Sequence, residues 1–562
     1  MHLKNLFLII GCALNIAQLY AQDSYLIVKN KNGATLGYAP HSGVKILKIK
    51  GVNFKDLNKN GRLDKYEDWR LPAEDRAEDL AKKMSIEQIA GLMLYSRHQA
   101  IPALPGGYFG GTYNGGRSFP ESGAKAWELS DQQKQFLKRD NLRHVLLTSV
   151  QSPEIAAKWN NAEQAYVEGL GLGIPANNSS DPRHTAKATT EFNAGAGGII
   201  SLWPDGLAMA ATFDPDITRQ FGKIASQEYR ALGITTALSP QADLGTEPRW
   251  YRITGTFGES PELARDMTMA YIDGFQTSSG KKEIKDGWGY KSVNAMVKHW
   301  PGGGPEEGGR DAHWAYGKFA VYPGANLKDH LTPFIDGAFQ LKGKTGKASA
   351  IMPYYTISYG IDSIYNENVG NGFSKYILTD LLRKQHNYDG VICTDWLVTA
   401  DEGGTPDMFA GKPWGVEQMN VAERHYKALI AGVDQFGGNN EQQPVIDAYH
   451  MGVNEFGVRL TRRRFEASAR RLLMNMFRTG LFENPYLDPL ETKKLVGNAA
   501  FMKAGYEAQL KSVVMLKNHE KVLPLPASKT VFIPKIYYPA RKNFFGLLEP
   551  PRFEYPIDTS LV

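Results

Sequence analysis

The feature that most constrains the fold of this chain is a series of eight short apolar runs spaced along residues 71–455. Amphipathic, helix-like stretches such as 214–232 and 375–385 lie between several of these runs. Short apolar runs that alternate with helices are typical of buried parallel strands. Eight in succession favour closure, so we predict an α/β fold with a TIM-like (β/α)8 barrel over 71–455. The runs span residues 89–95, 145–148, 170–175, 234–240, 295–300, 349–355, 390–395 and 431–436.

The composition is that of a globular protein, because 42% of the 562 residues are hydrophobic and 22% are charged. The net charge is +6, with both signs interspersed and no basic tract, which argues against nucleic acid as a partner. No apolar stretch reaches the ~20 residues that a membrane span needs. We therefore expect no membrane span. After the barrel, we expect connecting helices over 456–500.

The first 21 residues have the pattern of a secretory signal peptide. Lys4 precedes an apolar stretch over 6–17, and a small residue stands before Gln22, where cleavage is expected. The predicted location is therefore periplasmic or secreted, and a lipoprotein cleavage box at 9–12 is the alternative. Cleavage removes Cys12 and leaves Cys393 alone, so an intramolecular disulfide is excluded.

The segment over 22–70 contains a loop with the EF-hand calcium pattern at 56–67. Oxygen-bearing side chains fall at loop positions 1, 3, 5, 9 and 12, a backbone carbonyl falls at position 7, and Gly61 stands at the sharp turn. The spacing predicts one structural Ca²⁺ that orders the entry into the barrel. Its ligands would be Asp56, Asn58, Asn60, Arg62, Asp64 and Glu67.

Several of the apolar runs end in polar or aromatic residues. Asp395 follows the run Gly-Val-Ile-Cys-Thr, Lys298 and His299 end another, and Asp181 follows a third. Side chains at the carboxyl ends of barrel strands converge on one mouth, where barrel enzymes carry out their chemistry. Carboxylates, cations and flat indoles together suit a sugar, whose hydroxyls need polar partners and whose ring stacks on an aromatic face.

These motifs resemble glycoside hydrolase family 3, the β-glucosidase-like retaining enzymes. The segment 390–396 resembles the family's nucleophile motif, and Lys298-His299 resembles its sugar-binding pair. The segments 248–252 and 257–261 resemble its arginine-containing signature. The segment 511–525 resembles the opening of the family's α/β-sandwich domain, so 501–562 is expected to be the incomplete beginning of that domain.

The resemblance implies an exo-acting retaining β-glycosidase that hydrolyses terminal β-linked sugars of an oligosaccharide or glycoside. Asp395 would be the nucleophile that forms the glycosyl-enzyme intermediate. No organic cofactor is expected. The implied substrate-binding residues are Asp181, Arg252, Lys298, His299, Arg310, Tyr355 and Trp396.

The proton donor is the open part of this prediction. Two-domain members take an acid/base glutamate from the second domain, and we assign none in 501–562. The glycine-rich loop over 300–313 resembles the β-N-acetylglucosaminidase branch, whose Asp–His dyad makes His313 a candidate acid/base; Glu306 and Glu307 of this loop are expected in solvent. The alternatives are an N-acetylhexosaminidase-type enzyme, a sugar-binding pseudoenzyme or fragment without its acid/base, and Schiff-base chemistry at Lys298.

Overall fold

The computed structural model describes residues 25–104, 106, 110–185, 199–406, 408–526, 528–542 and 548–557. The predicted signal peptide over 1–21, with Cys12, lies outside the described residues. None of the described helices combines the length and apolar character needed to cross a bilayer.

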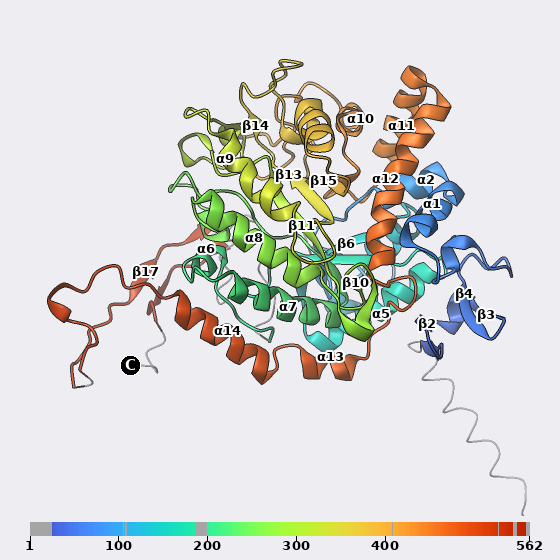
Figure 1. Cartoon of the computed structure of the whole chain (residues 1–562), viewed down its shortest axis with the longest axis horizontal. Helices are drawn as coiled ribbons and strands as arrows, with labels where there is room; N and C mark the ends of the chain where they lie inside the picture. Colours follow the sequence, from blue (N-terminus) through green and yellow to red (C-terminus); the bar gives the residue numbers. More distant parts are fainter. Residues whose placement is uncertain are drawn as a thin grey trace, which may run out of the picture.

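A parallel sheet forms the centre of the molecule (Figure 1). Its strands are β5 (Gln99–Ile101), β6 (His144–Val150), β7 (Asn177–Ser180), β8 (Ile234–Ala237), β11 (Asn294–Trp300), β13 (Ala350–Pro353), β15 (Val391–Trp396) and β16 (Gln435–Gly437). Neighbouring strands pair in parallel in the order β16-β15-β13-β11-β8-β7-β6-β5. This succession confirms the predicted α/β barrel class.

Residues 94 and 95 close the sheet into a barrel. Leu94 forms a parallel bridge with Phe436 of β16, and Tyr95 forms one with His144 of β6. The backbone N–H of Tyr95 donates to the Phe436 carbonyl at 2.9 Å. The short segment therefore takes the place of the first barrel strand, between β16 and β6.

Two of the eight predicted runs differ from the observed strands. Most of 89–95 belongs to helix α2 (Ile86–Leu92), and only its last two residues join the sheet. The run 170–175 precedes a strand, and the strand itself is the polar β7. A polar strand can be buried here because its side chains are hydrogen-bonded: Asn178 Nδ2 donates to Glu163 Oε2 at 2.8 Å. The other six runs overlap observed strands.

Helices surround the sheet (Figure 1). The predicted helical stretches 214–232 and 375–385 are confirmed as α7 (Pro215–Ala231) and η9 (Tyr376–Gln385). Asp214 caps α7 by accepting from the Asp216 N–H, and proline at the first helical position suits this start. The other helices of the barrel are α3 (Phe119–Ser122), α4 (Asp131–Lys138), α5 (Pro153–Glu168), α6 (Gly206–Ala210), α8 (Pro261–Gln276), α9 (Leu327–Thr332), η7 (Pro333–Ala338), α10 (Val421–Ala431), α11 (Gln443–Phe456) and α12 (Val458–Arg478).

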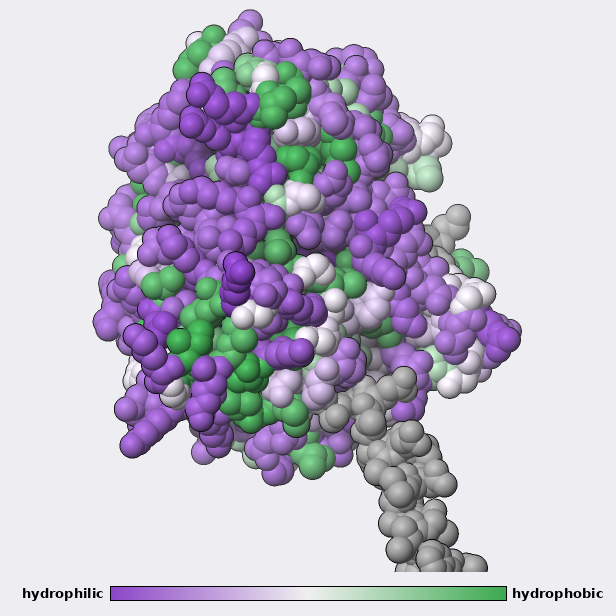
Figure 2. Space-filling model, turned by 90° about the vertical axis from the view of Figure 1, so that its right-hand side faces the viewer, coloured by the Kyte–Doolittle hydropathy of each residue, from purple (hydrophilic) through white to green (hydrophobic). Residues whose placement is uncertain are grey.

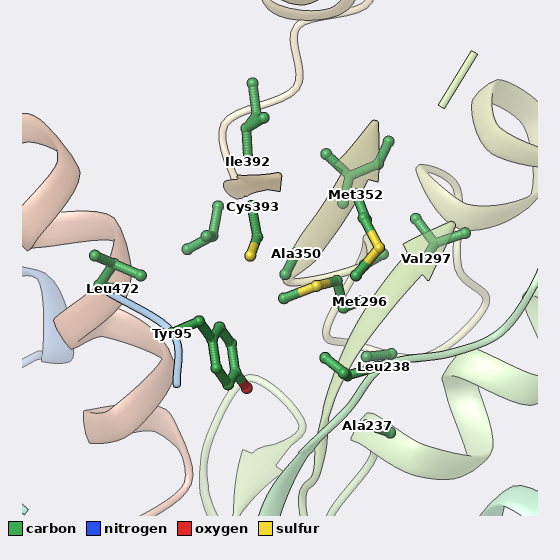
Figure 3. Close-up of a cluster of buried hydrophobic side chains, with 14 of the residues drawn as sticks. Tyr95, Ala237, Leu238, Met296, Val297, Ala350, Met352, Ile392, Cys393 and Leu472 are labelled. Atoms are coloured by element: carbon green, nitrogen blue, oxygen red, sulfur yellow. The ribbon is translucent and has the colours of Figure 1, made fainter. Parts of the chain in front are cut away.

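The barrel interior is filled by apolar side chains. Tyr95, Met296, Met352 and Cys393 point into it from different strands and are at most 1% exposed (Figure 3). Burial raises the pKa of the Cys393 thiol, which therefore stays protonated and packs as a small apolar group. The side of the molecule that carries α1, α2 and α12 is mostly hydrophilic, with apolar residues gathered in separate patches (Figure 2).

The N-terminal segment forms two antiparallel hairpins, β1–β2 (Leu26–Lys29, Thr35–Tyr38) and β3–β4 (Lys45–Ile49, Val52–Asp56). Strand β4 runs directly into the loop 56–67, which ends in η2 (Lys65–Glu67) before α1 (Ala73–Lys83). A buried ion pair between Lys55 Nζ and Glu168 Oε1, 2.7 Å apart, ties this segment to α5.

Two helices, α13 (Pro489–Leu495) and α14 (Ala499–Ser512), follow the barrel. The described residues after 512 form an extended tail with two short ladders, β17–β20 (Ile536–Tyr538, Arg552–Glu554) and β18–β19 (Arg541–Lys542, Leu548–Glu549) (Figure 1). Large apolar side chains of this tail are exposed, Leu516 to 92% and Phe532 to 87%. The α/β-sandwich beginning expected over 501–562 therefore stays a prediction.

Short hairpins and bridges complete the described structure. They are the antiparallel hairpin β9–β10 (Glu283–Lys285, Trp288–Gly289) and the parallel pair β12–β14 (Phe319–Ala320, Ile357–Ser358).

Candidate active site

The carboxyl ends of the barrel strands hold a narrow buried pocket. Asp181 follows β7, Lys298 and His299 lie just before the last residue of β11, and Asp395 is the penultimate residue of β15. The side chains that line the pocket are His98, Asp181, Leu238, Arg252, Lys298, His299, His313, Met352, Asp395 and Trp396. Seven of the residues expected from the sequence are thus brought together at one place.

Asp395 is delivered by an apolar strand to the floor of this pocket and is 7% exposed. Its Oδ1 accepts a hydrogen bond from the Trp396 N–H at 2.7 Å. Its Oδ2 lies 3.7 Å from His299 Nε2. The carboxylate is therefore held by one oxygen, while the other faces the pocket histidine.

Lys298 and Asp181 form a buried ion pair across the pocket. Lys298 Nζ donates to Asp181 Oδ1 at 3.0 Å, and both residues are less than 10% exposed. A buried charge is tolerated when it is paired. Because Lys298 Nζ is engaged by this carboxylate, the arrangement suits hydrogen bonding to hydroxyls better than Schiff-base formation.

His299 is held by Asp243, a fully buried carboxylate that sequence reasoning did not assign to the site. His299 Nδ1 lies 2.6 Å from Asp243 Oδ2, while Asp243 Oδ1 accepts from the backbone N–H groups of His299 at 3.0 Å and Gly303 at 2.6 Å. Burial alone would raise the pKa of Asp243, but His299 and these amides hold it below its usual value. Burial lowers the pKa of His299 to about 4, so the imidazole is neutral near pH 7.

Arg252 fixes the other side of the imidazole. Its Nη2 donates to His299 Nε2 at 3.3 Å, and its Nη1 donates to the Tyr354 hydroxyl at 3.3 Å. With Nδ1 donating to Asp243 and Nε2 accepting from Arg252, the imidazole carries its proton on Nδ1.

Asp311 holds the His313 ring in the way that Asp243 holds His299. It accepts from His313 Nδ1 at 2.5 Å, from Trp250 Nε1 at 2.7 Å and from the Tyr354 hydroxyl at 3.0 Å. Burial would raise the pKa of Asp311, but His313 and Arg252 lower it well below its usual value. An ionised Asp311 keeps the His313 ring in place, so that its edge packs against Tyr355 with ring centroids 4.7 Å apart.

Trp396 lines the pocket, whereas Tyr355 is not among the lining residues and contacts them from outside. The Tyr355 hydroxyl accepts from the Trp396 N–H at 3.2 Å, and Trp396 Nε1 donates to the Ser96 carbonyl at 3.1 Å. Both aromatic side chains are therefore fixed by hydrogen bonds at the level of the pocket.

The loop over 301–313 differs from its prediction. Arg310 has a side chain that is 59% exposed and lies 4.0 Å from Glu307, away from the pocket lining. Glu306, expected in solvent, is 2% exposed, and burial together with Asp311 raises its pKa well above the usual value. In this loop Glu306 and Asp311 thus face inward and Arg310 faces outward. The spacing of these residues in the sequence does not predict which of them are buried.

The loop over 56–67 has a tight turn with inward-facing oxygens. Gly61 adopts φ +74 at the sixth position, and Asp56 accepts from the N–H groups of Asn60 and Gly61, each at 3.0 Å. The side-chain amides of Asn58 and Asn60 both donate to Asp64 Oδ2, at 2.7 and 2.8 Å. Over the described residues, no group of three or more His, Cys, Asp or Glu side chains is arranged to hold a metal ion.

The fold and the pocket define an α/β-barrel protein whose strand ends present carboxylates, cations and indoles in one buried space. The family model described as "Glycosyl hydrolase family 3 N terminal domain" matches residues 118–474, and the chain belongs to this family.

Curated relatives support this assignment. The chain is 39% identical over 504 residues to the "Periplasmic beta-glucosidase/beta-xylosidase" of Dickeya chrysanthemi, covering 87% of the chain and 71% of that protein. It is 36% identical over 463 residues to the "Probable beta-glucosidase C" of Aspergillus flavus, covering 82% of the chain and 66% of that protein.

Solved structures share the fold. A β-glucosidase from Erythrobacter marinus superposes with a TM-score of 0.62 at 22% identity, covering 82% of the chain and 52% of that structure. The chain thus spans 71% and 66% of the two curated relatives and about half of this solved structure.

Proposed function

We propose that the chain provides the catalytic barrel of an exo-acting retaining β-glycosidase that takes β-glucosides or β-xylosides. The observation that carries the proposal is the position of Asp395, whose carboxylate shares one narrow pocket with Lys298, His299, Arg252 and Asp181. The sugar class is taken from the printed names of the relatives. A pocket with a closed floor admits the end of a saccharide chain, which supports exo action.

In this reaction Asp395 attacks the anomeric carbon as the glycosidic C–O bond breaks, and the leaving oxygen takes a proton from an acid. The product is a glycosyl ester on Asp395. Water, deprotonated by the same acid/base, then releases the sugar and regenerates the carboxylate, so the configuration is retained. Lys298 and Asp181 are placed to hydrogen-bond hydroxyls of the bound ring, and Trp396 offers a flat face.

Labelling with 2-fluoro-glycosides tests the nucleophile. A 2-fluoro-β-glucoside and a 2-fluoro-β-xyloside with dinitrophenyl leaving groups are expected to inactivate the protein and to leave a sugar ester on Asp395 in the peptide map. Asp395→Asn should take no label, and Asp401→Asn, which removes an exposed carboxylate six residues further on, should be labelled normally. Sugar binding without labelling would instead identify a binding protein, and label on another carboxylate would refute the assignment.

His313 is the candidate acid/base that the described residues offer in the pocket wall. Its Nδ1 is engaged by Asp311, which is how a carboxylate orients a histidine for proton transfer at Nε2. The dyad also favours a second candidate function, an N-acetylhexosaminidase-type reaction.

Leaving-group dependence separates a proton donor from a wall residue. His313→Ala should lower kcat/KM for a poor leaving group by about 100-fold or more, and much less for dinitrophenolate, which departs without a proton. Equal losses for both leaving groups would mean that His313 only shapes the pocket. Comparing glucosides with N-acetylglucosaminides decides between the two candidate functions.

We also propose that the loop 56–67 binds one structural Ca²⁺. In support, the side chains of Asn58 and Asn60 converge on Asp64. The Lys83 ammonium lies 3.0 Å from Asp64 Oδ1, so the Asp64 carboxylate already binds a positive charge at this place. Bound Ca²⁺ would take the oxygens of the two amides in place of their NH2 groups, together with the carboxylates and the carbonyl of residue 62. Three of the six proposed ligands are neutral oxygens and three are carboxylates, so the site depends on amide and carbonyl oxygens as much as on carboxylates.

Calcium titration of the chelator-treated protein tests this site. Ca²⁺ should raise Tm in a saturable way, while Mg²⁺ at the same concentration should not. Lys83→Met should strengthen the response and Asp64→Ala should abolish it. Equal responses of these variants and the native chain would contradict the proposal.

The predicted location also stays a proposal. A relative named as periplasmic supports export, and the first 21 residues have the pattern of a signal peptide. Amino-terminal sequencing of the exported protein should find Gln22 as its first residue.

A further inference from the structure

A second polar cavity lies at the end of the barrel opposite the active-site pocket. It has a volume of 170 Å³ and lies between the carboxyl-terminal half of α12 and the residues that precede β13 and β15. Its lining includes the charged side chains Lys347, Asp389, Arg470, Arg471 and Arg478. Strand β15 begins at this cavity and ends at Asp395, so the two sites lie at opposite ends of one strand.

The charge of the lining is strongly unbalanced. Lys347, Arg470, Arg471 and Arg478 contribute four cations, and Asp389 is the one carboxylate among the lining residues. Asp389 is already paired with Lys347, at 3.1 Å from Nζ, and its side chain is 79% exposed. Two of the three arginines also have a carboxylate partner outside the lining, since Arg478 Nη2 lies 3.6 Å from Glu74 Oε1 and Arg471 pairs with Asp434. The lining itself holds three guanidinium groups and no carboxylate besides Asp389.

Arg471 has a donor that its protein neighbours leave unused. Its Nη1 donates to Asp434 Oδ1 at 3.0 Å, but its Nε is buried and meets no acceptor among the described residues. Asp434 cannot satisfy it, because this carboxylate also accepts from Arg383 at 2.6 Å and from the Ser468 hydroxyl at 2.6 Å. A buried N–H of a charged group without an acceptor costs free energy, so an acceptor from outside the chain would be favourable here.

We propose that this cavity binds a small tetrahedral oxyanion, inorganic sulfate or phosphate. Such an ion offers several acceptor oxygens to the diverging N–H groups of guanidinium side chains, which bind tetrahedral oxyanions by charge-assisted hydrogen bonds. The cavity, about 170 Å³ in volume, has room for an ion of this size. The bound anion neutralises the repulsion among the arginines and clamps α12 to the starts of β13 and β15.

Calorimetric titration at low ionic strength tests the proposal, with sodium sulfate, sodium phosphate and, as reference, sodium chloride. Sulfate and phosphate should bind at one saturable site and raise Tm, while chloride at equal ionic strength should do neither. Saturation separates the site from the general stabilisation that sulfate exerts by exclusion from protein surfaces, which grows steadily with concentration. Titration with glucose 6-sulfate tests whether the ligand is a sulfate ester instead of the free ion. If the protein binds glucose 6-sulfate tenfold more tightly than inorganic sulfate, the proposal of an inorganic ligand is overturned.

Opposite charge changes give opposite expected results. Arg470→Gln removes an exposed cation of the lining and should weaken sulfate binding about fivefold, as expected for one charge a few ångströms away in a partly solvated site. Asp389→Asn removes the lining carboxylate and should strengthen binding by a similar factor. Arg463→Gln, two turns earlier on α12 and exposed, is the matched control and should leave the affinity unchanged. Equal affinities of all four proteins, or no saturable binding, would overturn the proposal.

Discussion

Replacing Asp243 by asparagine tests whether the pocket depends on the protonation pattern of one buried histidine. The carboxylate accepts three hydrogen bonds, from His299 Nδ1 and from the backbone N–H groups of His299 and Gly303. Asparagine keeps the shape but has one acceptor oxygen. If that oxygen keeps the two amides, the new NH2 group faces His299 Nδ1–H, and two donors meet.

The imidazole then relieves the conflict by moving its proton to Nε2, where it meets the donor Arg252 Nη2 at 3.3 Å. One hydrogen bond to a charged group is lost, which costs about 1.5–3 kcal/mol. Since 1.36 kcal/mol is a factor of ten in rate, kcat/KM should fall about 10- to 100-fold. The pH profile above pH 5 should keep its shape, because the pKa of His299 is already about 4 and loss of the nearby carboxylate lowers it further.

The assay is the pH dependence of kcat/KM with an aryl β-glucoside, together with the free energy of unfolding in urea. Asp205→Asn is the matched control, because Asp205 caps α6 and asparagine caps helices as well as aspartate does. The control should keep its activity within about twofold. An Asp243→Asn protein with unchanged kcat/KM would refute the role given to the Asp243–His299 pair.

Three other substitutions probe the barrel itself. Burial raises the pKa of Glu163 to about 8, so the native state keeps a proton that the unfolded chain releases near pH 4.5. The free energy of unfolding therefore falls as the pH rises from about 5 to 8. Glu163→Gln should flatten this pH dependence in thermal unfolding and raise the stability at pH 8. Asp434→Asn leaves buried arginine partners without their carboxylate and should cost about 3–5 kcal/mol in urea unfolding, so a loss below 1 kcal/mol would contradict it. A Cβ at Gly274 would lie 2.6 Å from the Arg219 carbonyl oxygen, so Gly274→Ala should lower the free energy of unfolding by about 1–3 kcal/mol. Gly404→Ala is the control, because a Cβ there meets no other atom within 4 Å, and it should change the free energy of unfolding little.

The sequence predicts the barrel because six of its strands overlap short, largely apolar runs whose side chains are mostly buried. The exceptions have physical causes. Strand β7 is built from Asn177 to Ser180, whose burial depends on hydrogen-bond partners from distant helices that no local pattern reveals. The strand at 94–95 is too short to stand apart from the helix before it.

The pocket is predicted to the extent that its residues directly follow strands. Asp395, Lys298 and His299 are found in this way, since the end of a strand fixes where its last side chains lie. Asp311 belongs to the Asp–His pattern that points to His313, and Asp243 stands in a polar cluster after an apolar run, but the sequence gives neither a role of its own because both act by holding histidines. Asp243 follows the run 234–240 by three residues, a signal that could have identified it.

Cys393 is the single thiol of the chain beyond the predicted signal peptide. Its reactivity reports how often the barrel strand that carries it separates from its neighbours. Cys393 lies two residues before Asp395 on β15, and its side chain is fully buried. A thiol reagent can therefore modify it only when that strand separates from its neighbours. The rate of modification at increasing reagent concentration measures how often the strand that bears Asp395 opens, without any label having to be introduced.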